Sequence, residues 1–346
     1  MRVTIKDIAE YTKLSITTVS LVLNNKPSRI TEETRRAVFD AAAKLNYTPN
    51  QMAVGLARKR TRMLGLIIGD LENYFFASLA TAVESACNKR GWQMLLCSTS
   101  NRHSRDIEAI KLLVSRGVDG VLYNMSTDCT VEKAWQSKEI FEQYVLPVVI
   151  VDRSFHMEGE NAVMIDHEMG GYLATKHLLN HGHRDIFCLT GPKHLSCSQN
   201  RLMGYRRALE EWDIPYNPQY TIRGDYTMQS GISAAETIAR LSGTAVFAHN
   251  DMMAFGLYKA QSKMRKKIPN EISIVGYDDI SFCELLDPPL TTIRQPVHEL
   301  GEAAVDRLIR VIEGEKDTKT QLFPPSLVER GSVINHHTNQ IITNIL

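Results

Sequence analysis

The sequence lacks any apolar run of the roughly 20 residues that a membrane-spanning helix needs, and its charged N-terminus has no signal-peptide core. Its six cysteines are scattered, with no C-x-x-C pair and no paired histidine at zinc spacing. These absences predict a cytoplasmic protein whose cysteines are free buried thiols, except that Cys197 is expected in a polar loop.

Motifs that would indicate an enzyme are also missing. There is no G-x-G-x-x-G after a predicted strand, no phosphate loop ending in G-K-S/T, no H-E-x-x-H and no G-x-S-x-G. The densest histidine group is His167, His177, His181 and His183, and the sequence identifies no third ligand for the i, i+4 pair His177 and His181. We therefore expect surface or helix-end histidines, no metal, no cofactor and no enzymatic activity.

Residues 3–24 carry the most informative pattern of the chain. Apolar residues at helical spacing begin at Ile5, stop before Ser15 and resume after it, so Ser15 is a predicted N-cap between two short helices. Such a helix-turn-helix places its second helix in the major groove of DNA, here with an outward side of Ile16, Thr17, Thr18 and Leu21. A helical hairpin without a partner is the alternative, but this face lacks the alternating charges of an ordinary solvated surface.

Charge is distributed unevenly along the chain. Residues 1–60 contain eleven Lys and Arg against five Asp and Glu, a surplus of six positive charges. Because the whole chain carries +1, the remaining residues carry −5. Lys and Arg that neutralise phosphates supply most sequence-independent affinity for DNA, so we expect the basic end to be the nucleic-acid end.

The N-terminal motifs resemble those of one family. The order I-K-D-I-A, S-x-x-T-V-S-x-V-L-N, E-T-R and L-N-Y-x-P-N is that of the LacI-type transcriptional repressors, and this chain supplies each piece. The resemblance implies DNA contacts by Thr4, Ser15, Ile16, Thr17, Thr18, Ser20, Leu21, Asn24, Arg29 and Asn50. Many relatives carry Arg or His in place of Leu21, which cannot make the bidentate contact that specifies guanine. We expect contact with a thymine methyl, or recognition of groove shape, at that position.

The headpiece of residues 1–48 is followed by a predicted hinge over residues 49–61. Pro49 could start a helix there, but the segment is too short to be stable alone, and Gly55 costs about 1 kcal/mol relative to Ala. In LacI-type proteins the corresponding hinge helix pairs with that of the dimer mate in the minor groove. The resemblance assigns the wedge between base pairs to Leu56, with Ala57 beside it. A flexible basic linker is the alternative.

From Arg62 onward, short apolar runs typical of buried parallel strands alternate with amphipathic stretches. These runs span residues 63–68, 93–96, 120–123, 147–151, 162–165, 186–190, 245–248 and 272–275. They are more strands than we expect in a single sheet. We therefore predict an α/β core of two doubly wound lobes, linked by three crossings and separated by a cleft.

Polar stretches between the runs predict where the core of residues 62–333 divides. A crossing is predicted at 158–161, and the extended segments 290–295 and 321–325 could cross back. The predicted lobes are 62–159 with 292–321, and 160–291 with 322–333. The tail, 334–346, lacks the heptads that make some relatives tetramers, so we expect a homodimer.

Polar side chains follow several predicted strands, and ligands of open α/β sheets bind at these carboxyl ends. Asp152 and Arg153 follow one strand, Asn250 another and Asp278 a third. Carboxylate, amide and guanidinium groups suit hydroxyl-rich ligands, and aromatic faces pack against a sugar ring. Each residue alone could instead be a helix N-cap.

The combination resembles the pocket of periplasmic ribose-binding proteins, a fold that LacI-type cores share. The resemblance implies the ligand set Asn73, Phe75, Phe76, Asp152, Arg153, Arg201, Tyr226, Asn250, Asp278 and Gln295. Purine-sensing relatives carry Arg and Thr around positions 195 and 197, where this chain has Leu195 and Cys197. The sequence therefore favours a sugar over a purine.

These inferences predict a periplasmic-binding-protein-like core behind a DNA-binding headpiece, in a repressor of a sugar-utilisation operon. Its partners would be a palindromic double-stranded DNA operator, a second copy of the chain and a small sugar, first of all ribose. Fructose, sucrose, another sugar or a purine are the alternative effectors, and a sugar-binding module without DNA regulation is the alternative of another class. The sequence does not give the sign of the coupling, so the effector could be an inducer or a corepressor.

Overall fold

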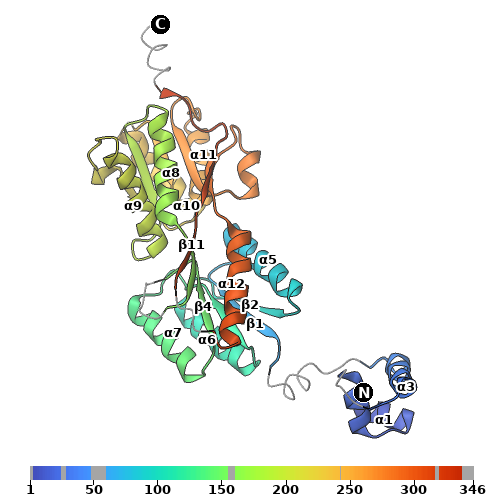
Figure 1. Ribbon diagram of the computed structural model, residues 1–346. Helices are drawn as coiled ribbons and strands as arrows, with labels where there is room; N and C mark the ends of the chain where they lie inside the picture. Colours follow the sequence, from blue (N-terminus) through green and yellow to red (C-terminus); the bar gives the residue numbers. More distant parts are fainter. Residues whose placement is uncertain are drawn as a thin grey trace. The chain divides into compact units, whose positions relative to one another are not determined.

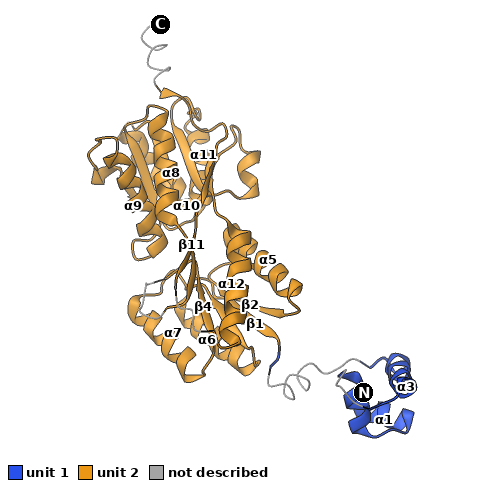
Figure 2. Cartoon of the chain, in the orientation of Figure 1, with its two compact units in different colours: residues 1–61 blue, residues 62–346 orange. Residues whose placement is uncertain are grey.

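The computed structural model describes residues 3–24, 29–47, 60–154, 160–241, 243–315 and 319–336. The chain forms two compact units, residues 1–61 and residues 62–346 (Figure 2). No helix in the described ranges is long and apolar enough to cross a membrane.

The first unit contains the predicted helix-turn-helix. Its helices are α1 (Ile5–Thr12), α2 (Ile16–Leu23) and α3 (Glu32–Lys44) (Figure 1). The Oγ of Ser15 accepts a hydrogen bond of 3.0 Å from the backbone N–H of Thr18, which confirms the predicted N-cap. Lys13 takes a left-handed φ of 57° after α1 and thereby turns the chain. The three helices share a core of Ile8, Ala9, Val19, Val22, Val38 and Ala41.

The first lobe of the second unit is built on a six-stranded sheet in the order β11-β5-β4-β3-β1-β2 (Figure 1). Its strands are β1 (Met63–Ile68), β2 (Gln93–Ser98), β3 (Gly120–Tyr123), β4 (Val148–Val151), β5 (Ala162–Ile165) and β11 (Gln321–Phe323). All neighbouring strands are parallel, as the buried apolar runs predict.

Helices cover both faces of this sheet. They are α5 (Tyr74–Lys89) and α12 (Val297–Ile312) on one face, and α6 (His103–Ser115) and α7 (Val131–Gln143) on the other. Leu64 and Leu66 of β1 pack with α5 and α12, whereas Ile67 packs with α6 and α7. Side chains alternate between the faces of a strand, so one apolar run supplies both cores.

The second lobe repeats this architecture with the strand order β12-β10-β9-β8-β6-β7. Its strands are β6 (Ile186–Thr190), β7 (Thr221–Arg223), β8 (Ala245–Ala248), β9 (Ser273–Asp278), β10 (Thr291–Arg294) and β12 (Ser326–Val328). Only the pair β10–β12 is antiparallel among the described strands of this sheet. The helices α8 (His167–Asn180) and α9 (Ser196–Glu210) pack on one face, and α10 (Met228–Arg240) and α11 (Asp251–Lys263) pack on the other. Short 3-10 turns are η1 (Pro218–Tyr220) and η2 (Ser281–Leu285).

The lobes divide at other residues than the sequence predicts. β5 pairs with β4 and β11 in the first sheet, so the chain crosses at Asp166 and not at 158–161. β10 pairs with β9 in the second sheet, so the return crossing follows Arg294. The third crossing lies between β11 and β12. An apolar run does not show which sheet it joins, because that depends on partners far away in the sequence.

Two further strands differ from the sequence-based prediction. β7 was not predicted, since a three-residue edge strand has too little pattern to recognise. β2 was predicted as a buried strand, but it lies at the edge of its sheet with exposed or half-buried side chains.

Candidate functional site

The headpiece presents part of the predicted DNA-reading surface on α2. Ile16 is 49% exposed and Thr17 is exposed, whereas Thr18, Ser20 and Leu21 are half-buried. Val19 and Val22, on the opposite side of α2, are fully buried in the three-helix core. The helix therefore has one face fixed by packing and another available to a partner.

Several predicted DNA contacts also stabilise the headpiece. Thr4 donates to Asp7 Oδ2 from its backbone N–H at 2.6 Å and from its hydroxyl at 2.7 Å, which caps α1 and lowers the pKa of Asp7. Ser15 caps α2, and Asn24 Nδ2 donates to the carbonyl of Ser20 at 2.8 Å. Arg29 is exposed, whereas Asn50, Leu56 and Ala57 lie outside the described residues.

The second unit contains a pocket that brings the whole predicted ligand set together. Its free volume is only about 20 Å³, room for about one water molecule, so these side chains are closely packed and must separate to admit a ligand. The first lobe and the second crossing contribute Asn73, Phe75, Phe76, Asp152, Arg153 and Gln295. The second lobe contributes Cys197, Arg201, Tyr226, Asn250 and Asp278.

Strand ends and helix starts place these side chains. Asn73 caps α5 through a 3.1 Å bond from the N–H of Phe75, and Asn250 caps α11 through a 2.9 Å bond from that of Met253. Both residues are therefore helix N-caps, as the alternative explanation predicts, and the start of each helix also places them at the pocket. Asp152 follows β4, and Asp278 ends β9. Both sheets thus point their carboxyl ends at the pocket, where open α/β sheets bind ligands.

Three pocket residues have left-handed backbone conformations. The φ angles are 67° at Asp152, 71° at Tyr226 and 125° at Asp278. Non-glycine residues rarely adopt such angles, at a cost of about 1–3 kcal/mol each, and they cluster at functional sites. The surrounding fold holds these three side chains toward the pocket against their backbone preference.

His167 forms hydrogen bonds with two charged residues of the pocket, Asp152 and Arg201. Its Nδ1 lies 3.3 Å from the Nε of Arg201, which can only donate, so Nδ1 accepts and Nε2 carries the proton. Nε2 then donates to Asp152 Oδ1 at 2.9 Å. Burial and the charge of Arg201 lower the pKa of His167, so the ring is neutral at pH 7. The first residue of α8 thereby connects a carboxylate of the first lobe to a guanidinium of the second.

The two pocket arginines lie over aromatic rings. The guanidinium carbon of Arg153 lies 4.9 Å from the centre of the Phe76 ring, and that of Arg201 lies 3.6 Å from the centre of the Tyr277 ring. Arg153 also donates to the backbone carbonyl of Met125 at 2.9 Å. Burial alone would raise the pKa of Asp152, but His167, Arg153 and Arg201 hold it below its ordinary value. Asp152 is therefore a carboxylate at pH 7.

The pKa of Asp278 shifts in the opposite direction from that of Asp152. Burial, together with the nearby carboxylate of Asp251, raises the pKa of Asp278 well above its ordinary value. Gln295 Nε2 donates to Asp278 Oδ1 at 2.5 Å. Within the described part of the chain, the buried atoms Gln295 Oε1 and Arg153 Nε find no hydrogen-bond partner. An acceptor and a donor thus remain for a ligand, since leaving such groups unpaired costs about 1–3 kcal/mol each.

Some residues around the pocket were not predicted as site residues or were assigned differently. Cys197 was expected in a polar loop, but it lies in the first turn of α9, is 3% exposed and has its Sγ 3.5 Å from the hydroxyl of Tyr226. His167, His177 and His183 are buried and not on the surface, although His167 begins α8 and His177 lies in its last turn, as expected of helix-end residues. The sequence carries no signal for these contacts, because each partner comes from a distant segment.

Comparisons with known proteins agree with this architecture. Residues 4–50 match the family model described as bacterial regulatory proteins, lacI family, and residues 175–333 match that of a periplasmic binding protein-like domain. The HTH-type transcriptional repressor PurR of Vibrio campbellii (strain ATCC BAA-1116) is 35% identical over 334 residues, which cover 95% of this chain and 98% of that protein. The HTH-type transcriptional regulator DegA of Bacillus subtilis (strain 168) is 34% identical over 334 residues, which cover 96% and 98%.

Solved structures show the same likeness. The lac repressor dimer bound to operator and the anti-inducer ONPF superimposes with a TM-score of 0.87 at 30% identity, over 96% of this chain and 100% of that chain. A LacI family regulator from Enterococcus faecium with bound ribose superimposes with a TM-score of 0.70 at 30% identity, over 79% and 99%. The chain therefore belongs to the lacI family of bacterial regulatory proteins, and it is a DNA-binding transcriptional regulator and not an enzyme.

Proposed function

We propose that this regulator is a homodimeric repressor, acting in the cytoplasm where a bacterial chromosome lies, that couples a palindromic operator to a small sugar. Ribose is the first effector to test. The observation that carries the proposal is the pocket, in which directional donors and acceptors surround the aromatic rings of Phe75, Phe76 and Tyr226. Such a site suits a ring with several hydroxyl groups and an apolar face.

The electrostatics of the pocket support a neutral, hydroxylated ligand. Asp152, a carboxylate, accepts hydrogen bonds, and Arg153 and Arg201 donate them. Asp278, whose pKa is raised, can serve in either role, and Gln295 Oε1 offers a further acceptor. Each hydroxyl of a sugar both donates and accepts, so it can pair with groups of either kind.

A purine is the second candidate effector, because the similar HTH-type transcriptional repressor of Vibrio campbellii, 35% identical to this chain, bears the name PurR. Two residues oppose it. Leu195 and Cys197 are both 3% exposed, and Cys197 lines the pocket where the resemblance to purine-sensing relatives would require a Thr. A buried thiol is a weak hydrogen-bonding group for the polar edge of a base.

A pair of aromatic rings supports the homodimer. Tyr74, in α5 of the first lobe, and Phe282, in η2 of the second, contact edge to face with ring centres 5.0 Å apart. They remain 41% and 40% exposed, and Leu285 of η2 is 77% exposed. Apolar side chains gathered from both lobes on one surface are typical of a subunit interface.

Thermal unfolding of the full chain with ribose, other sugars and purines, followed by calorimetric titration of each hit, tests the effector. A ligand that binds only the native state raises the unfolding temperature, and we expect ribose to do so and to change affinity for the operator in a gel shift. A response to another sugar would correct only the name of the ligand. A response to purines alone would overturn the sugar proposal, and a lack of sequence preference in the gel shift at raised salt would overturn operator recognition.

A further inference from the structure

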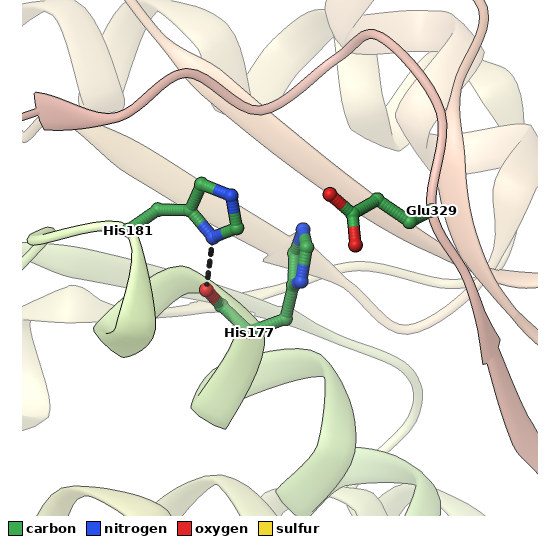
Figure 3. A group of neighbouring side chains, drawn as sticks. All are labelled: His177, His181 and Glu329. Atoms are coloured by element: carbon green, nitrogen blue, oxygen red, sulfur yellow. Dashed lines mark hydrogen bonds between the residues drawn. The ribbon is translucent and has the colours of Figure 1, made fainter.

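A cluster of three potential metal ligands lies in the second lobe, outside the pocket residues. His177 belongs to the last turn of α8, His181 is the C-cap of that helix, and Glu329 directly follows β12 (Figure 3). One ring nitrogen of each histidine and one carboxylate oxygen all lie within 4.8 Å of one another. Segments about 150 positions apart in the chain thus bring together side chains that bind transition metals.

His177 contributes a buried nitrogen that the protein leaves unsatisfied. The residue is 6% exposed, and its Nε2 has no hydrogen-bond partner among the described residues. Burial, with a smaller effect of His181, lowers the pKa of His177 to about 4, so the ring is neutral at pH 7. A neutral imidazole is the form that binds metal ions. Leaving such a buried group unpaired is unfavourable, and a bound ion would offset that cost.

His181 is oriented to coordinate through Nε2. Its Nδ1 lies 2.8 Å from the backbone carbonyl of His177, drawn as a dashed line in Figure 3. A carbonyl oxygen only accepts, so Nδ1 carries the proton and Nε2 carries the lone pair. Metal-binding histidines almost always donate their other N–H to a carbonyl or carboxylate in this way, which fixes the tautomer and the direction of the ring.

Glu329 supplies an oxygen that can move into place. In Figure 3 its carboxylate lies beside the two rings, whose centres are 4.3 Å apart. Tetrahedral ligands at about 2.0–2.1 Å from a zinc ion lie roughly 3.3 Å from one another. The three ligand atoms lie within 4.8 Å of one another, a wider limit than the spacing around a zinc ion. Because Glu329 is exposed and His181 is half-buried, rotation of these side chains can bring the ligand atoms closer together.

We propose that His177, His181 and Glu329 bind a divalent transition-metal ion of the zinc class, with water as the remaining ligand. Two imidazoles and one carboxylate suit Zn²⁺, Co²⁺ or Ni²⁺, whereas Mg²⁺ and Ca²⁺ prefer sites built of oxygen. The ion links the C-terminal end of α8 to Glu329, the residue that follows β12. It therefore stabilises the second lobe at a point distinct from the effector pocket.

Cobalt titration of the untagged full chain, after removal of metals with a chelator, tests this site. We expect one Co²⁺ per chain, with the visible absorption of tetrahedral coordination, and displacement by Zn²⁺. Glu329→Gln removes an exposed ligand and should weaken Co²⁺ binding at least tenfold without loss of folding. His181→Gln should do the same, and circular dichroism verifies that both variants are folded.

A matched control is His298→Gln, because His298 is also exposed and has a glutamate, Glu302, at i, i+4 with a separation of 3.9 Å. This variant should bind Co²⁺ as the unmodified chain does. The proposal is wrong if the unmodified chain binds no stoichiometric Co²⁺. It is equally wrong if Glu329→Gln and His181→Gln bind Co²⁺ as well as His298→Gln.

Discussion

Gln295 Nε2 donates a 2.5 Å hydrogen bond to Asp278 Oδ1, so the residue that follows β10 at the return crossing holds the carboxyl group at the end of β9. The same glutamine keeps a buried Oε1 without a partner in the described structure. A ligand hydroxyl between these two side chains can complete both sets of hydrogen bonds. A change of crossing geometry would alter the pocket through this contact, which links effector binding to the relative positions of the two lobes.

Asp278→Asn is expected to separate ligand binding from stability. Burial raises the pKa of Asp278, so the fold disfavours its ionised form and the unfolded chain ionises first as the pH rises. Asn keeps an oxygen for Gln295 and carries no charge, so the free energy of unfolding at pH 7 should stay equal or increase. Effector affinity should fall by about 2- to 10-fold, since the hydrogen bond of a neutral carboxyl group contributes about 0.5–1.5 kcal/mol. Denaturant unfolding and calorimetric titration measure the two effects, and unchanged effector affinity would remove Asp278 from the site.

Arg153→Ala should abolish the effector response and leave operator binding nearly intact. The guanidinium lies over Phe76 and has a buried Nε without a described partner, so its loss removes both charge and shape from the pocket. Operator gel shifts with and without effector provide the measurement and its internal control. A parallel loss of operator affinity in the absence of effector would show instead that Arg153 supports the fold of the core.

Gly191→Ala tests whether effector binding depends on the position of the Tyr226 ring. A Cβ at residue 191 would lie 2.1 Å from Cζ of Tyr226, so the ring must leave its place. We expect about a tenfold loss of effector affinity, similar to that of Tyr226→Ala. The double variant should bind as weakly as Tyr226→Ala alone, because both changes remove one interaction. Fully additive losses would mean that Gly191 acts through a different contact.

Ile16→Ala is expected to weaken operator binding about tenfold and non-specific binding much less. Ile16 is an exposed apolar residue on the outward face of α2, and base contacts, unlike phosphate contacts, carry the sequence information. Phe39→Ala is the matched control, because Phe39 is also 49% exposed but lies on α3. Gel shifts on operator and random DNA compare the variants. Equal losses for the two variants would contradict the placement of α2 in the groove.

The buried histidines predict a loss of core stability in mild acid. Burial lowers the pKa of His177 and of His183 to about 4, whereas an unfolded histidine titrates near pH 6.5. The unfolded chain binds protons first, so the free energy of unfolding should fall as the pH drops from about 6.5 toward 4, by on the order of 1–2 kcal/mol per residue. Urea unfolding of the core at about pH 7 and about pH 5, with a chelator present, measures this slope. His183→Asn should flatten the slope, and His298→Gln should not.

The sequence alone determined the helix-turn-helix, because its apolar spacing and the Ser15 cap are local features. It also located most of the parallel strands, since a buried strand needs a continuous apolar run whatever its neighbours are. The residues that line the pocket follow from the same logic. A side chain just after a parallel strand lies at the ligand-binding edge of the sheet, whereas Arg201, Tyr226 and Gln295 were predicted from the resemblance to a known family pattern.

Tertiary structure decided the contacts that join distant segments. Whether β5 and β10 belong to the first or the second sheet depends on hydrogen bonds to other strands, and an apolar run is the same in either sheet. The tautomer of His167 and the raised pKa of Asp278 depend on burial and on charges brought in from other elements. The meeting of His177 and His181 with Glu329 likewise requires β12 to lie beside α8. Local sequence specifies which residues can form such groups, and the folded chain alone sets their distances.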